Sequence, residues 1–241
     1  MTITFCYAVS KLSLVIAVII EESQNPKDRG VAMVQALVNC DRMTFEEFID
    51  WYPEDGKRYE LYRGAVREMM PIGDHELTSS FLSEELTLEV RSNHPNYRVS
   101  RMCLLKPEMA ETGFIPDVVV IDRLELVNEP LWQKASVIQN GKTIPLVIEV
   151  VSTNWSDDYA IKLSQYEVMG IAEYWIVDYR ALGAVRHIGK PKQPTVTVCK
   201  LIEGEYQLFL FTSGKRIESD ILPKLNLMTD TIFQAAIEVA G

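Results

Sequence analysis

The 241-residue chain has few of the residues that mark several common kinds of functional site. Its four cysteines lie far apart and form no CxxC pair, which argues against a zinc site or a redox centre and favours reduced thiols in a cytoplasmic protein. Its three histidines are equally scattered, so an HExxH zinc helix is excluded. Any metal ion must therefore be held mainly by carboxylates.

Positive charge is scarce as well. Lysine and arginine number 24 against 34 aspartates and glutamates, a net charge of -10 at pH 7. This balance disfavours nonspecific adhesion to nucleic acid, which is itself a polyanion. Hydrophobic residues make up 47% of the chain, enough to bury a sizeable core.

Long apolar runs are also missing, although residues 3–20 come close. Lys11 interrupts this segment, and its continuous part, residues 12–20, is too short to span a bilayer. Acidic residues follow it in place of a cleavage site for a signal peptide. We therefore expect residues 1–42 to be a leader and linker outside the fold, and residues 43–241 to form a single domain. A membrane anchor at residues 3–20 is the alternative.

The remaining chain alternates between helical and extended patterns. Thr44 and Glu47 form a capping box at the start of a short helix, and a hairpin follows with its turn at Arg63 and Gly64. An amphipathic helix is predicted over 74–92, with apolar positions that include Leu77, Phe81, Leu82, Leu86 and Leu88. Further extended segments are predicted at 97–107, 114–121, 144–151, 173–178, 195–202 and 206–211, with helices at 157–169 and from 229. This order predicts an α/β fold: a central mixed β-sheet flanked by helices, with an extra C-terminal β-hairpin and helix.

Two carboxylates stand where carboxylates are costly. Glu149 lies within a continuous apolar strand, and Asp117 follows Pro116 at the start of another. An ionised carboxylate that is buried without a partner costs several kcal/mol or else takes up a proton. A cation is therefore expected near Glu149, and the two acids can face one pocket if their strands are neighbours.

The helix after Glu149 offers such a cation. Asp158 and Lys162 are four residues apart and share a face, with Tyr166 one turn further. Paired carboxylates bind a hard divalent ion such as Mg²⁺, with water and substrate phosphate as further ligands. Because an ammonium group can stabilise the transition state or orient the nucleophile, this set of residues is compatible with phosphodiester hydrolysis.

A purely structural interpretation explains the same spacing. Glu149 can pair with Lys162 in the core, Asp117 can be solvated, and Asp158 and Lys162 can form an ordinary helix pair. From spacing alone the structural interpretation is preferred. It is also preferred for Glu60, for Asp178 at a strand end, and for His75, which is expected to cap a helix or lie on the surface.

Five segments nevertheless carry a family resemblance. In chain order they read GKRYELYRG, PDVVVIDR, LVIEVVS, DYAIKLSQY and GIAEYWIVD. The series resembles the bacterial Uma family of restriction-endonuclease-like proteins, within the PD-(D/E)xK nuclease superfamily, over residues 43 to about 235. The resemblance implies a restriction-endonuclease-like α/β core.

The resemblance also implies roles for individual residues. The metal ligands would be Asp117, Glu149 and the backbone carbonyl of Val150. The common superfamily pattern has a lysine two residues after the second acid, where this chain has Val151; family members instead have it on the next helix, at Lys162. Further positions match the family as follows: Asp158 and Tyr166 around that lysine, the early glutamate at Glu60, and a helix-start histidine at His75. The sequence departs from the family after Glu149, where it reads Ser152, Thr153, Asn154 and Trp155, and at Tyr179, which leaves the substrate contacts open.

The implied activity is that of a DNA endonuclease dependent on Mg²⁺ or Mn²⁺, without a small-molecule cofactor. The catalytic residues would be Asp117, Glu149, Lys162, Glu60 and Asp158. Residues 107–178 carry 12 acidic against four basic residues, so weak, salt-sensitive DNA binding is expected unless a homodimer joins two surfaces. The alternative is an inactive nuclease-fold binding or regulatory protein in which these groups form a salt-bridge network.

Overall fold

The computed structural model describes residues 3–9, 12–18, 37–39, 42–69 and 73–236. Strands β1 (Ile3–Val9), β2 (Leu12–Val18) and β3 (Leu37–Asn39) pair with one another in an antiparallel sheet. The separation of residues 1–42 from the domain stays a prediction, and much of that segment lies outside the described residues. In the described part of the chain, no helix combines the length and the apolar character needed to cross a membrane.

The domain begins with the two elements that local signals predict. Helix α1 (Phe45–Trp51) has the expected capping box, in which Thr44 Oγ1 accepts from the Glu47 N–H at 3.1 Å and the Thr44 N–H donates to Glu47 Oε2 at 2.8 Å. Strands β4 (Arg58–Tyr62) and β5 (Ala65–Met69) form the predicted hairpin. Arg63 and Gly64 both have positive φ at its two-residue turn, as a type I′ turn requires.

A six-stranded mixed sheet forms the centre of the domain, which confirms the predicted fold class. Its strand order is β13-β12-β11-β10-β8-β6. Strands β10 (Leu146–Val150) and β11 (Glu173–Asp178) are parallel, and the other neighbours pair antiparallel. These others are β6 (Tyr97–Ser100), β8 (Val118–Asp122), β12 (Thr195–Ile202) and β13 (Glu205–Phe211), the last two forming the predicted C-terminal hairpin.

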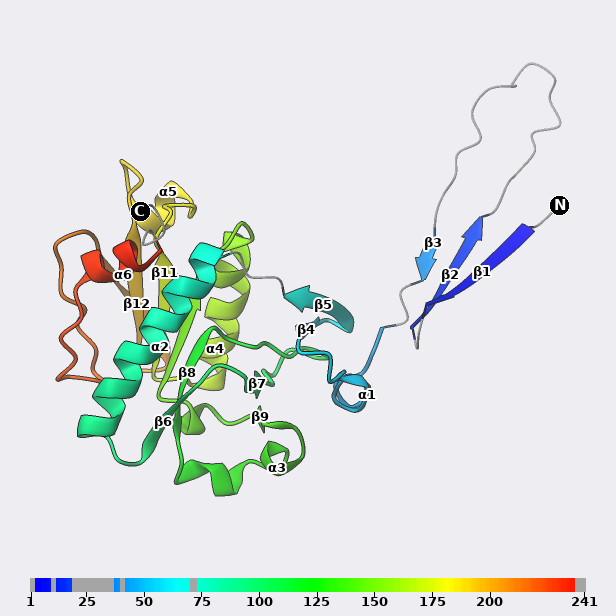
Figure 1. Ribbon diagram of the computed structural model, residues 1–241, viewed down its shortest axis with the longest axis horizontal. Helices are drawn as coiled ribbons and strands as arrows, with labels where there is room; N and C mark the ends of the chain where they lie inside the picture. The colour runs from blue at the N-terminus through cyan, green and yellow to red at the C-terminus, as the bar shows by residue number, and fades with distance from the viewer. Residues whose placement is uncertain (1–2, 10–11, 19–36, 40–41, 70–72, 237–241) are drawn as a thin grey trace, which may run out of the picture.

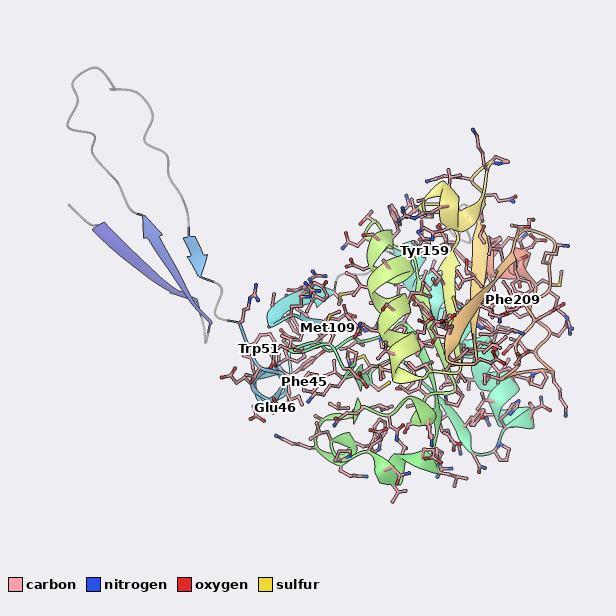
Figure 2. All side chains as sticks on the ribbon, turned by 180° about the vertical axis from the view of Figure 1, so that it is seen from behind. Phe45, Glu46, Trp51, Met109, Tyr159 and Phe209 are labelled. Carbon is pink, nitrogen blue, oxygen red and sulfur yellow. The ribbon has the colours of Figure 1, made fainter. Side chains whose placement is uncertain are left out.

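Helices cover both faces of this sheet. Helix α2 (Gly73–Asn93), in front in Figure 1, packs with α6 (Thr229–Ala235) on one face. On the opposite face lie the π-helix η3 (Asp157–Lys162) and α4 (Leu163–Met169), which come to the front when the molecule is seen from behind in Figure 2. The core strands β8, β10 and β11 are therefore buried on both sides, which explains their continuous apolar sequence.

The buried face of α2 differs in part from the expected stripe. Leu82 and Leu86 are buried as expected. Leu77 and Leu88 were expected in the core but are 41% and 62% exposed. The buried face also includes His75 and Val90, which were not expected there. Because that face packs on the sheet, the first turn of α2 points His75 toward the ends of the strands rather than to solvent.

The segment between β8 and β10 contains short elements that no pattern predicted. They are η1 (Glu125–Asn128), α3 (Trp132–Ala135), β9 (Val137–Ile138) and η2 (Gly141–Thr143); β9 pairs in parallel with β7 (Leu104–Leu105). The predicted strand at 97–107 is accordingly divided between β6 and β7. A later short helix, α5 (Val185–Ile188), was also not predicted.

Candidate active site

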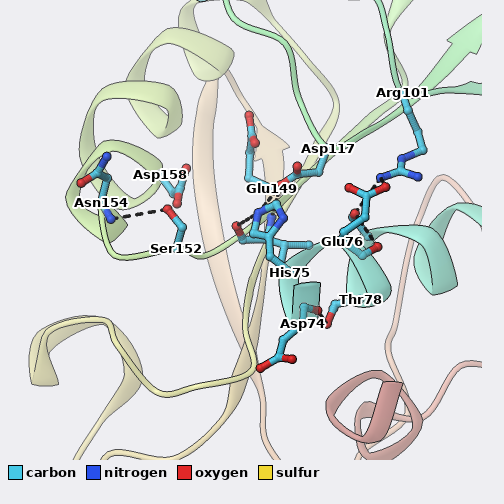
Figure 3. A network of polar contacts seen from close by, with 12 residues as sticks. Asp74, His75, Glu76, Thr78, Arg101, Asp117, Glu149, Ser152, Asn154 and Asp158 are labelled. Atoms are coloured by element: carbon cyan, nitrogen blue, oxygen red, sulfur yellow. Dashed lines mark hydrogen bonds and ion pairs between the residues drawn. The ribbon is translucent and has the colours of Figure 1, made fainter. Parts of the chain in front are cut away.

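Asp117 and Glu149 meet because β8 and β10 are neighbours. The last antiparallel pair is Val118 with Ile148, so the next position along the ladder places Asp117 opposite Glu149. Cross-strand partners lie on the same face of a sheet, and both side chains line one pocket of about 300 Å³. Figure 3 shows them together with His75 from α2 and Asp158 from η3.

Asp117 is held by two donors. Its Oδ2 accepts the Val150 backbone N–H at 2.8 Å and lies 3.2 Å from His75 Nε2. The same His75 nitrogen is 2.9 Å from the Val150 carbonyl oxygen. Because a carbonyl can only accept, His75 Nε2 carries a hydrogen, so one imidazole N–H bridges the Asp117 carboxylate and the Val150 carbonyl.

Lys162 is the cation that the buried acids require. Its Nζ is 2.9 Å from Glu149 Oε1, 3.4 Å from Glu60 Oε1 and 3.9 Å from Asp158 Oδ1. The Tyr166 hydroxyl donates to the same Glu149 oxygen at 2.7 Å. Glu60 reaches this cluster from the hairpin, where its Oε1 also accepts the Ile115 N–H at 3.0 Å.

The helix that delivers Lys162 differs from the predicted regular α-helix. Its first six residues, from Asp157 to Lys162, form a π-helix, and α-helical geometry resumes at Leu163. Tyr174 of the neighbouring strand donates its hydroxyl to the Asp158 carbonyl at 3.1 Å, inside this wider turn. Short π-helical stretches occur often at functional sites. Here the π-helix spans the interval that carries both Asp158 and Lys162.

The charges in the site are unbalanced. Four buried carboxyl groups, those of Glu60, Asp117, Glu149 and Asp158, surround the single ammonium group of Lys162. Burial raises the pKa of Glu149 to about 7; Lys162 opposes this shift, and Asp117 and Glu60 reinforce it. Burial likewise raises the pKa of Asp158 well above its ordinary value. Burial acts to lower the pKa of Lys162, but the surrounding carboxylates outweigh it and raise that pKa, so the lysine stays charged.

His75 and Asp117 shift each other in the opposite sense. Burial acts to raise the pKa of Asp117, but the hydrogen bond and charge of His75 bring it below its ordinary value. Burial acts to lower the pKa of His75, but the hydrogen bond and charge of Asp117, together with the contact to the Val150 carbonyl, raise that pKa above its ordinary value. Asp117 is therefore an anion in this fold, which suits a metal ligand.

The donor set suits a hard divalent cation. Within the described residues, Asp117 Oδ1 and Glu149 Oε2 accept no hydrogen bond, and the Val150 carbonyl lines the same pocket. No three His, Cys, Asp or Glu side chains gather there in a metal-binding arrangement, again among the residues that the structure describes. A metal ion at this place would therefore need water or substrate oxygens to complete its shell, as Mg²⁺ commonly does.

All the residues proposed from the sequence for the site are brought together: Asp117, Glu149, Val150, Lys162, Glu60 and Asp158. The expectation that His75 is a cap or surface residue is wrong. The helical spacing of the sequence could have predicted that His75 is buried, since it lies one turn before Ser79 and on the same face of α2 as Leu82. Asp178 has a structural role, since its carboxylate accepts the N–H groups of Leu182 and Gly183 at 2.9 and 2.7 Å.

Comparisons with known proteins agree with this architecture. Residues 45–230 match the model of the Uma2 family, described as "Putative restriction endonuclease". The fold is similar to the crystal structure of a protein from Anabaena variabilis ATCC 29413, described as "a putative nuclease belonging to DUF820", with a TM-score of 0.60 and 17% sequence identity. The similarity covers 80% of this chain and 99% of that one. No curated protein matches the sequence.

Proposed function

The chain belongs to the Uma2 family, and from this premise we propose that it hydrolyses phosphodiester bonds in DNA with the help of Mg²⁺ or Mn²⁺, in the cytoplasm. The observation that carries the proposal is the meeting of Asp117 and Glu149 in one pocket, each with a carboxylate oxygen left open. Two anions and a backbone carbonyl are hard oxygen donors, which these ions prefer. Asp117, Glu149 and the Val150 carbonyl would hold the ion.

A divalent ion would lower the pKa of a water molecule bound to it and neutralise charge on the phosphoryl group. The chain's own residues supply positioning. Lys162 keeps its charge beside Glu149 and can stabilise the negative charge that develops on the phosphate. Glu60 and Asp158 hold the lysine from either side, and Tyr166 fixes the Glu149 carboxylate by donating to Oε1.

His75 contributes by orienting two of the proposed metal-binding groups at once. Its single N–H contacts both Asp117 Oδ2 and the Val150 carbonyl, which are supplied by different strands. The imidazole thereby fixes the Asp117 carboxylate and the Val150 carbonyl relative to each other and leaves Asp117 Oδ1 open. Because misplacement of a reacting group by about 1 Å costs roughly a hundredfold in rate, this alignment matters for catalysis.

Plasmid cleavage tests the proposal. Wild-type protein with Mg²⁺ or Mn²⁺ is expected to nick supercoiled DNA, and EDTA is expected to stop the reaction. Asp117→Asn and Glu149→Gln are expected to abolish cleavage while keeping the shape of the site. Asp122→Asn is the matched control, since Asp122 lies at the far end of β8 from Asp117 and, among the described residues, accepts a hydrogen bond from the Leu124 N–H alone. Undiminished cleavage by both site variants would refute the assignment.

One observation favours a second candidate, an inactive nuclease-fold binding or regulatory protein. The charge of Lys162 is met by three carboxylates of the chain itself. A closed network of this kind can be purely structural. Titration calorimetry separates the candidates, because the catalytic site is expected to bind Mn²⁺ saturably and to lose that binding in Glu149→Gln, whereas a structural network is expected to bind none.

A further inference from the structure

The β4–β5 hairpin brings positive charge to the edge of the acidic pocket. Residues 57–69 include four basic and two acidic residues, in a chain whose net charge is -10. Arg58 and Met69, at the open ends of the two strands, line the pocket together with Asp117, Glu149 and Lys162. The hairpin is therefore a wall of the candidate active site.

The register of the hairpin decides which side chains face the site. Arg58 pairs with Met69, Glu60 with Arg67, and Tyr62 with Ala65. Cross-strand partners and alternate residues share a face, so these six side chains lie on one side of the hairpin. Glu60 is on that side and lies 3.4 Å from Lys162. The same face therefore presents Arg67 directly across from Glu60 and Arg58 two residues before it.

The two arginines keep their charge available to a ligand. Glu60 is buried and already engaged by Lys162 and the Ile115 N–H. Within the described residues Arg58 forms no ion pair. Arg67 lies 4.2 Å from the centre of the Tyr62 ring and pairs with Asp157 at 3.2 Å, in a partly exposed contact of the kind that contributes little free energy. A stronger anion can replace Asp157 at small cost.

We propose that this arginine face, made of Arg58, Tyr62 and Arg67, binds the sugar–phosphate backbone of DNA next to the phosphodiester that is cut. The proposal rests on the proposed function and names its substrate contacts. Arg58 contacts a phosphate at the mouth of the pocket. Arg67 exchanges Asp157 for a second phosphate while its guanidinium stays against the Tyr62 ring. Guanidinium groups suit this role because they bind phosphate oxygens in pairs.

Salt dependence of binding tests the contact with Arg58. Binding of a fluorescein-labelled DNA duplex is followed by anisotropy in EDTA over a series of NaCl concentrations, so that no cleavage interferes. Each phosphate contact contributes about 0.9 to the slope of log K against log salt. Arg58→Gln is expected to lower that slope by about 0.9, and Arg58→Lys, which keeps the charge, is expected to retain most of it.

Lys57→Gln is the matched control. Lys57 adjoins the same hairpin, but its charge is already paired with that of Glu68, at 2.9 Å. If only the overall charge of the hairpin matters, Lys57→Gln and Arg58→Gln lose affinity equally, and the proposal is overturned. An unchanged slope in Lys57→Gln together with a reduced slope in Arg58→Gln supports it.

A pair of variants with opposite expectations tests Arg67. Arg67→Gln and Asp157→Asn both break the same ion pair, but only the first removes the guanidinium. Arg67→Gln is expected to weaken DNA binding and Asp157→Asn to strengthen it. If both weaken binding equally, Arg67 is a latch between hairpin and helix and the assignment fails. DNA binding with the expected slopes but no cleavage in Mg²⁺ or Mn²⁺ refutes the proposed function and leaves the arginine face as a DNA-binding surface.

Discussion

Replacing Lys162 by methionine is expected to destabilise the fold far more than the loss of an exposed lysine ion pair would. Lys162 and Lys134 each hold a carboxylate at nearly the same distance, 2.9 Å for Glu149 and 2.8 Å for Asp50. Their surroundings differ, because the Lys162 side chain is 7% exposed and that of Lys134 is 62% exposed. The two substitutions therefore compare a buried ammonium group among several carboxylates with an exposed one that has a single partner.

The expected magnitude follows from what each substitution leaves behind. Without Lys162, the carboxylates of Glu149, Glu60 and Asp158 remain buried with no ammonium group, and removal of one partner from a buried pair costs about 3–5 kcal/mol. Without Lys134, Asp50 remains in solvent, and such a pair contributes between roughly 0 and 1 kcal/mol. At about 2–4 °C per kcal/mol for a chain of this size, Tm is expected to fall by about 6–20 °C for Lys162→Met and by less than about 4 °C for Lys134→Met.

Urea unfolding in EDTA, with the m-value monitored, measures both changes. The double variant Lys162→Met/Glu149→Gln is expected to recover part of the lost stability, because it removes a charge that lacks a partner. Lowering the pH is expected to reduce the cost of Lys162→Met further, since the remaining carboxyl groups take up protons. Equal destabilisation by Lys162→Met and Lys134→Met would refute the reasoning.

Further outcomes are expected away from the site. Burial raises the pKa of Glu173, so the stability that this carboxyl group contributes is present below its unfolded pKa near 4.5 and is lost as the pH rises through the folded value. In urea melts, the free energy of unfolding of the wild type is therefore expected to increase relative to that of Glu173→Gln as the pH falls from neutral. The opposite pH dependence would exclude this linkage. A Cβ at Gly141 would lie 2.0 Å from the Met169 carbonyl oxygen, so Gly141→Ala is expected to lower the free energy of unfolding by at least about 1–3 kcal/mol. Gly73 has open space around it, so Gly73→Ala is expected to cause no measurable loss of stability in the same melts. The edge strand β13 exposes Leu208, Phe209 and Leu210, an arrangement that favours pairing with a second copy of the chain. In sedimentation experiments Phe209→Lys is expected to convert a homodimer to monomer, and Val127→Lys, at another exposed position, is the control. A wild type that is monomeric at every concentration would count against pairing through this edge.

The sequence predicted those parts of the fold that depend on neighbouring residues. The capping box at Thr44 and the turn at Arg63 and Gly64 involve contacts across only a few positions, and both are confirmed. The apolar strands around Asp117 and Glu149 were recognisable because both of their faces are buried. The unpredicted segment at 125–143 depends instead on Glu129, whose carboxylate accepts the N–H groups of Gln139 and Asn140. No local periodicity records contacts of this kind.

The residues of the site that could be predicted are those whose charge is unfavourable in a buried position. Glu149 stood out because an acid among aliphatic residues needs a cation, and Lys162 supplies it. His75 and Arg58 gave no such signal, since a histidine at a helix start and an arginine at a strand start are ordinary surface residues in most sequences. Their roles depend on packing, which turns α2 and the hairpin toward the ends of β8 and β10.

The crossover from β10 to β11 also gives the buried charges an order of assembly. Glu149 and Lys162 are 13 positions apart, whereas Asp117 precedes Glu149 by 32 positions and Glu60 by 89. Loop closure costs about 0.6 kcal/mol more for each doubling of the loop length, so the contact between Glu149 and Lys162 has the smallest entropic cost. We expect this pair to form first as the chain condenses, so that the acid enters the growing interior already accompanied by its counterion, and the more distant carboxylates join a local charge that is already neutral.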